Sequence, residues 1–79
     1  MFLHVDEAVY ISDYKLQVKF NNNEVKKVDL RDELYGEVFE PLKDKQFFKD
    51  FFISHNTIEW KNGADFAPEF LFEIGQNIK

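Results

Sequence analysis

The chain has 79 residues, no cysteine and a net charge of −5, with 15 acidic residues against 10 basic ones. This length allows one small domain with one core, so residues 1–79 are expected to form a single domain. The missing cysteines exclude disulfides and zinc–thiolate sites, and the negative charge disfavours nucleic acid and anionic membranes as partners.

Aromatic residues are the expected source of stability. The chain contains ten Phe, three Tyr and one Trp. Each buried ring removes roughly 150 to 250 Å² from water. We therefore expect a core that needs no cross-link, metal or cofactor.

The N-terminal residues 1–6 lack the basic region and long apolar run of a signal peptide. No apolar run approaches the roughly 18 residues that a membrane-spanning helix requires. A cytoplasmic protein without membrane contact is expected.

The first predicted elements are two strands. Residues 14–20 alternate apolar and polar side chains, which indicates a half-buried strand. The apolar residues 8–11 precede it, and Ser12 and Asp13 provide turn-forming side chains between the two runs. A first hairpin is expected here.

A third strand is predicted over residues 24–30, after a turn of three Asn residues. Val25 and Val28 break its alternation. A bulge near Lys26 and Lys27 would return the apolar side chains to the same face of the strand. The three strands together form an antiparallel meander.

Short helical segments are predicted in the middle of the chain. Residues 29–36 favour one helical turn that ends at Gly36, and residues 38–42 form an irregular apolar connection. Asp44 is a suitable N-cap for a short helix over residues 45–50.

A second hairpin and a closing helix complete the chain. Residues 51–54 and 57–60 are rich in β-branched and aromatic side chains and flank a two-residue turn. Pro68 fits the first turn of a helix over residues 68–77, whose apolar stripe faces the sheet. The predicted fold class is α+β, with a three-stranded meander and a second hairpin covered by the C-terminal helix.

The second half of the chain carries a recognisable motif: Trp60, Asn62, Gly63, Asp65 and Pro68, each with a local geometric role. With the alternating strand of residues 14–20, it resembles a small bacterial family catalogued as domain-of-unknown-function family 2442. The resemblance covers nearly the whole chain and implies a small α+β domain with no established functional residues.

Genes of this family resemble members of toxin–antitoxin pairs, because they often lie beside another small uncharacterised gene. Some members carry a separate DNA-binding domain, which is not expected within this chain. The resemblance implies a protein partner and no mechanism.

Candidate chemical groups are few. His4 and His55 are isolated, and metal sites need three or four converging ligands. Asp65 and Glu69 are four residues apart and could form a weak Mg²⁺ or Ca²⁺ site, although a short carboxylate at this position more often caps a turn. We predict no metal site and no catalytic residues.

Surplus aromatic side chains are the main functional signal. Phe72 is expected to point away from the apolar stripe of the last helix. Phe47 and Phe52 are expected to lie on the opposite side of their segments from the inward-facing Phe48, Phe51 and Ile53. Either irregular segments cover these rings, or they form an exposed patch that marks an interface.

The predicted function is a non-catalytic protein–protein interaction module, with Phe47, Phe52 and Phe72 as its candidate surface and an antitoxin-like role beside a basic partner. The alternatives are a self-associating homodimer and a small metal-dependent enzyme that uses His55, Asp65 and Glu69.

Overall fold

The computed structural model describes residues 2–78. Its main sheet is antiparallel and has four strands in the order β1-β2-β3-β6. The bounds are β1 Val5–Ser12, β2 Lys15–Phe20, β3 Val25–Asp29 and β6 Gln76–Asn77. The predicted meander is confirmed, and the short strand β6 extends it along the outer edge of β3.

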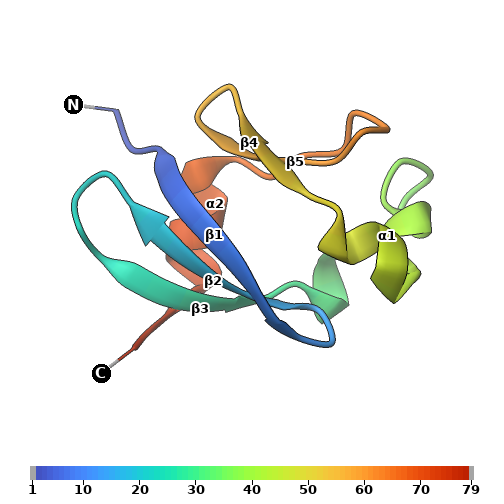
Figure 1. The fold of residues 1–79 in the computed structure, drawn as a ribbon, viewed down its shortest axis with the longest axis horizontal. Helices are drawn as coiled ribbons and strands as arrows, with labels where there is room; N and C mark the ends of the chain where they lie inside the picture. Colours follow the sequence, from blue (N-terminus) through green and yellow to red (C-terminus); the bar gives the residue numbers. More distant parts are fainter. Residues whose placement is uncertain (1, 79) are drawn as a thin grey trace.

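A separate two-stranded sheet joins β4 (Phe52–Ser54) to β5 (Thr57–Glu59). Its turn residues His55 and Asn56 both have positive φ, at 52° and 72°. That conformation is the one a two-residue type I′ hairpin turn requires. The predicted second hairpin is therefore confirmed, and it lies beside β1 (Figure 1).

Short helices connect and close the sheets. The 3-10 helices η1 (Arg31–Glu33) and η2 (Glu40–Lys43) lead to helix α1 (Lys45–Lys49), and helix α2 (Pro68–Ile74) follows the second hairpin. Asp44 caps α1 as predicted, because its side chain accepts a hydrogen bond from the backbone N–H of Gln46 at 3.0 Å.

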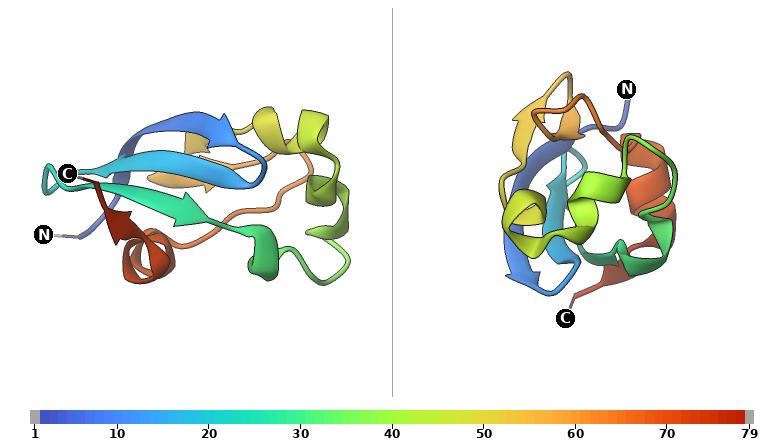
Figure 2. Two further views of the ribbon diagram at one scale, coloured as in Figure 1. Left: turned by 90° about the horizontal axis from the view of Figure 1, so that it is seen from below. Right: turned by 90° about the vertical axis from the view of Figure 1, so that its right-hand side faces the viewer.

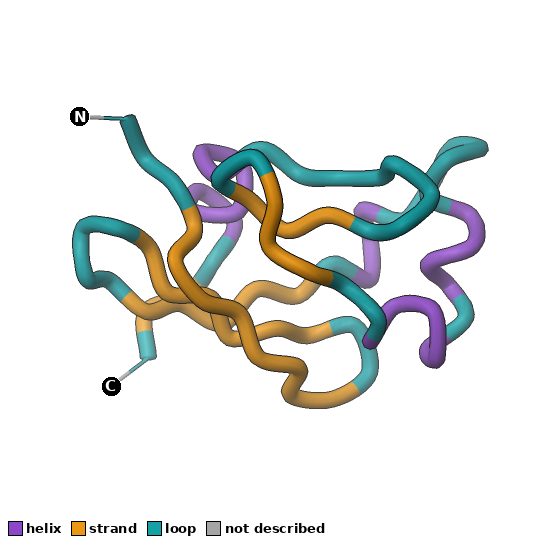
Figure 3. The backbone as a smooth tube through the Cα atoms, turned by 45° about the horizontal axis from the view of Figure 1, so that its top comes forward, coloured by secondary structure: helices purple, strands orange, loops and turns teal. Residues whose placement is uncertain are grey.

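Helix α2 lies on one face of the main sheet, while α1 and η2 close one end of the molecule (Figure 2). The path of the backbone between these parts can be followed in Figure 3. The α+β class and the covering C-terminal helix are thus confirmed. The helix is shorter than predicted, because the chain leaves it at Gly75 and residues 76–77 pair with β3 instead.

The predicted bulge in the third strand is wrong. Strand β3 pairs with β2 in unbroken register, and the irregularities lie in β1 instead. The alternation fails in the sequence because Lys26 takes an inward position opposite the buried Val18. Its aliphatic stem lies inside, and its ammonium group reaches Phe72 on α2.

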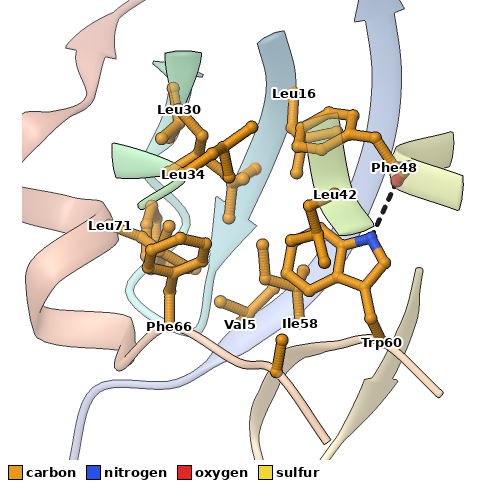
Figure 4. Packing of buried hydrophobic residues seen from close by; sticks show 14 residues of the cluster. Val5, Leu16, Leu30, Leu34, Leu42, Phe48, Ile58, Trp60, Phe66 and Leu71 are labelled. Atoms are coloured by element: carbon orange, nitrogen blue, oxygen red, sulfur yellow. Dashed lines mark hydrogen bonds between the residues drawn. The ribbon is translucent and has the colours of Figure 1, made fainter. Parts of the chain in front are cut away.

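One hydrophobic core lies between the inner face of the main sheet, α2 and the second hairpin (Figure 4). Its largest fully buried side chain is Trp60, whose indole Nε1 donates a hydrogen bond to the carbonyl oxygen of Phe48 at 2.9 Å. The indole is thereby hydrogen-bonded although no part of the residue is exposed. The aromatic core predicted from composition is present.

Candidate functional site

The three aromatic residues of the predicted surface differ in exposure. Phe52 on β4 is 44% exposed, whereas Phe47 and Phe72 are half-buried and packed against the core. The Phe72 ring packs edge-to-face on Phe20 of β2, with 5.1 Å between centroids. The expectation that Phe72 points away from the sheet is wrong.

The chain places its own cations over two of these surplus rings. The Nζ atom of Lys26 lies 3.8 Å from the Phe72 centroid, and that of Lys61 lies 5.7 Å from the Phe47 centroid. Both distances are within the range of cation–π attraction. Phe47 and Phe72 are thus each packed against the core and also lie under a lysine side chain.

A different group of aromatic side chains lines an open groove of about 270 Å³. The groove lies between two segments, one that contains η1 and the turn after it, and one that leads into α2. Its principal side chains are two acids, one Tyr and three Phe: Glu33, Tyr35, Phe39, Asp65, Phe66 and Phe70. We call these six residues the aromatic groove.

The three Phe rings of the aromatic groove form a ladder. Phe39 and Phe66 are stacked with 4.9 Å between centroids and 26° between planes, and Phe66 and Phe70 are stacked at 5.8 Å and 16°. Phe66 is buried, while Phe39 and Phe70 are half-buried. Tyr35, the fourth aromatic residue of the groove, is 70% exposed.

Buried and bridging hydrogen bonds fix the walls of the groove. The hydroxyl of Thr57 donates to the carbonyl oxygen of Phe66. The Asn62 side-chain amide donates to the carbonyl oxygen of Val38 at 2.9 Å, which ties the turn after the second hairpin to the segment before Phe39. The walls of the groove are therefore joined by hydrogen bonds between parts of the chain that are separated in sequence.

The family motif is largely what holds this geometry. Asn62 also accepts a hydrogen bond from the backbone N–H of Ala64 at 3.1 Å, and Gly63 has a φ of 92°. This left-handed conformation favours glycine. Pro68 occupies the first turn of α2 as predicted, and the buried Trp60 belongs to the core. Of the motif residues, only Asp65 lines the groove.

The two acids of the groove are free to receive a cation. Glu33 and Asp65 form no ion pair among residues 2–78. Asp13, in contrast, is paired with Lys45 at 3.1 Å and with Arg31 at 3.9 Å. The two carboxylates of the groove and this paired cluster are therefore in electrostatically different environments.

The residues of the predicted metal alternative lie apart. His55 Nδ1 is 3.4 Å from Glu59 Oε1 in the second hairpin, while Asp65 lines the aromatic groove and Glu69 is exposed on α2. Within the described part of the chain, no three His, Cys, Asp or Glu side chains are grouped so that they could hold a metal ion. His4, the other histidine, is half-buried, with its Nε2 3.2 Å from the Asn21 side-chain amide nitrogen.

Residues 5–77 match the family described as Protein of unknown function (DUF2442). The chain belongs to this family. DUF2442 membership agrees with the resemblance drawn from the Trp60–Pro68 motif and from the alternating strand that became β2.

Among curated proteins, carboxypeptidase Y of Komagataella phaffii (strain GS115 / ATCC 20864) is 35% identical to this DUF2442 chain over 80 residues. The alignment covers 90% of the chain and 15% of the length of that carboxypeptidase. No solved structure matches the chain. Between residues 2 and 78, none of the helices has the length and apolar character needed to cross a membrane.

The aromatic groove was missed by the reasoning from sequence. Its residues lie on two segments, 33–39 and 65–70, and only the packing of the intervening hairpin brings them together. A signal was present, because each segment begins with an acid and continues with aromatic residues. That repeated pattern carries no information about proximity until the fold is known.

Proposed function

We propose that the protein is a non-catalytic module that binds another protein through the aromatic groove. The observation that carries this proposal is the groove itself, which combines a ladder of Phe rings with two unpaired carboxylates. Aromatic side chains are enriched in protein interfaces because they provide large contact areas at low conformational cost. The proposal replaces the surface of Phe47, Phe52 and Phe72 by a site that the fold assembles.

The charge of the chain supports a basic partner. The net charge is −5, and complementary charge accelerates encounter and selects among partners. The resemblance of the family to toxin–antitoxin pairs supports the product of an adjacent gene as that partner, by analogy. We therefore propose an acidic, antitoxin-like role in the cytoplasm.

Co-expression tests this proposal. The product of the adjacent gene carries the affinity tag, and the untagged protein is followed through affinity and size-exclusion steps. We expect the two proteins to elute together at micromolar concentration. Separate elution at that concentration would contradict the pairing.

A homodimer is the second candidate, and it is favoured by a different feature of the structure. Within the described residues, β1 has a neighbouring hydrogen-bonded strand on one side only, and it exposes Val9 and Ile11 by 57% and 42%. The second hairpin lies beside this edge and bonds to it through the Val5 N–H and the Asn56 carbonyl oxygen, while the two exposed apolar side chains are suited to self-association. Sedimentation equilibrium distinguishes this candidate, because a monomer at every concentration rules it out.

A further inference from the structure

We infer that the aromatic groove binds an arginine side chain of the partner, with the guanidinium group against the Phe rings and its N–H groups bonded to Glu33 and Asp65. The inference rests on the proposed function and names the chemical group that the site recognises. It does not depend on the identity of the partner.

The first argument is the distribution of cations over aromatic rings. Outside the groove, the chain places cations over Phe72, Phe47, Tyr10 and Tyr14, at 3.8 to 5.9 Å from the ring centroids. Among the described residues, no such cation lies over any ring of the aromatic groove. The groove therefore has aromatic surface of the kind that the chain elsewhere covers with its own Lys and Arg.

The second argument is charge. Lys43, Lys45 and Lys61 each pair with a carboxylate elsewhere on the surface. Glu33 and Asp65 have no such partner in residues 2–78, although both line the same groove. A cation that enters the groove meets two carboxylates without breaking an existing ion pair.

The third argument is the shape of the ligand. A guanidinium group is planar and weakly hydrated, so it can stack on an aromatic ring while its five N–H donors reach carboxylates at the edge. An ammonium group is a compact and strongly hydrated point charge, which benefits less from a flat aromatic wall. The combination of rings and acids therefore favours arginine over lysine.

The fourth argument is size. The groove of about 270 Å³ lies just below the roughly 300 to 1,000 Å³ of pockets that enclose small-molecule ligands. It is open to solvent, and its Tyr35 is 70% exposed. A single side chain projecting from a polypeptide fits such a site better than a free cofactor does.

Peptide titration tests the inference directly. Three blocked pentapeptides, Gly-Ser-X-Ser-Gly with X as arginine, lysine or citrulline, are titrated into the ¹⁵N-labelled protein. We expect chemical-shift changes confined to residues 33–39 and 65–70. The arginine peptide is expected to bind about tenfold tighter than the citrulline peptide, since a charge-assisted hydrogen bond contributes about 1.5 kcal/mol or more. Equal binding of arginine and citrulline, equal binding of arginine and lysine, or shifts elsewhere would each overturn the inference.

Charge-removing variants provide the matched comparison. Glu33→Gln and Asp65→Asn keep the shape of each side chain, and each is expected to weaken the binding of the arginine peptide about tenfold. Glu73→Gln removes the same charge from an exposed position of α2 that does not line the groove, and we expect a change below about twofold. Equal effects of all three variants would indicate that only the net charge of the protein matters, and would contradict a specific site.

The outcomes separate this inference from the proposed function. If the adjacent gene product binds, and the two groove variants bind it as tightly as the unaltered protein does, the pairing stands, but the arginine site and the groove as the binding surface are both wrong. If the arginine peptide binds in the groove but the gene product does not, the arginine site stands and the pairing is wrong. A self-association that Asp65→Asn abolishes would show that a second copy of this chain fills the groove. That result would contradict the claim that an external partner fills it.

Discussion

Lys26 and Phe72 join the sheet to the C-terminal helix. The ammonium group of Lys26 lies 3.8 Å from the centre of the Phe72 ring and donates a hydrogen bond of 3.0 Å to the Phe72 carbonyl oxygen. Gly75 allows this approach, because a Cβ atom there would lie 2.9 Å from the Lys26 Cβ. The pair explains why a charged residue occupies an inward strand position and why a surplus ring is not an exposed patch.

Replacing Lys26 by Met is expected to destabilise the protein. The change keeps an unbranched side chain but removes the cation over Phe72 and the hydrogen bond to its carbonyl oxygen. We expect the free energy of unfolding to fall by about 1 to 2 kcal/mol in urea titrations. Lys27→Met is the control, since Lys27 is exposed on the same strand and should change stability by less than about 0.5 kcal/mol. Equal losses in the two variants would contradict the role given to Lys26.

Removing the Thr57 hydroxyl is expected to weaken the wall of the aromatic groove. Thr57→Val keeps the side-chain volume but leaves the carbonyl oxygen of Phe66 without its donor. A buried unpaired group costs about 1 to 3 kcal/mol, which thermal unfolding followed by circular dichroism measures. Thr57→Ser keeps the hydroxyl and should lose less. If Thr57→Ser is as destabilising as Thr57→Val, the loss of stability comes from the packing of the methyl group and not from the hydrogen bond.

Stability at acid pH should depend in part on Asp13. The hydrogen bond and the charge of Lys45 lower the pKa of the Asp13 carboxyl, with smaller effects from Arg31 and Lys15. A carboxyl with a lowered pKa stabilises the folded state above its unfolded pKa, and this contribution is lost as pH falls through the folded value. Melting temperatures measured from neutral pH to about pH 2 should therefore fall less steeply below about pH 4 for Asp13→Asn than for the unaltered protein.

Asn is the suitable replacement for Asp13, because it tolerates the positive φ of 46° at this turn. The effect should be small and should shrink in high salt, because the ion pair lies at the surface. Parallel pH curves for the two proteins at low salt would show that this cluster does not contribute to acid stability.

Local patterns predicted most of the strands. The strict alternation of residues 14–20 identified β2, and the residues of the His55–Asn56 turn identified the second hairpin, because both signals act within a few neighbouring positions. The bulge in β3 was a wrong inference from a sound observation. The spacing of Val25 and Val28 breaks the alternation because Lys26 takes an inward position, with its ammonium group over the ring of Phe72 on α2.

The candidate site was not predictable in the same way. Exposure of Phe47 and Phe72 depends on lysines that are distant in sequence, Lys61 for the first and Lys26 for the second. The aromatic groove depends on the approach of Phe39 to Phe66, which are stacked, and the Asn62 hydrogen bond to Val38 joins the same two segments at the surface. The resemblance identified Asn62 and Asp65 as motif residues, and only the fold shows that the first bridges to Val38 while the second lines the groove.

The most direct test of the account is calorimetric titration of the adjacent gene product with the unaltered protein and with a double variant, Glu33→Gln and Asp65→Asn. If an arginine of the partner enters the aromatic groove, the double variant should bind at least about thirtyfold more weakly, with a melting temperature close to that of the unaltered protein. An affinity that is unchanged in the double variant would contradict the claim that this groove is the binding site.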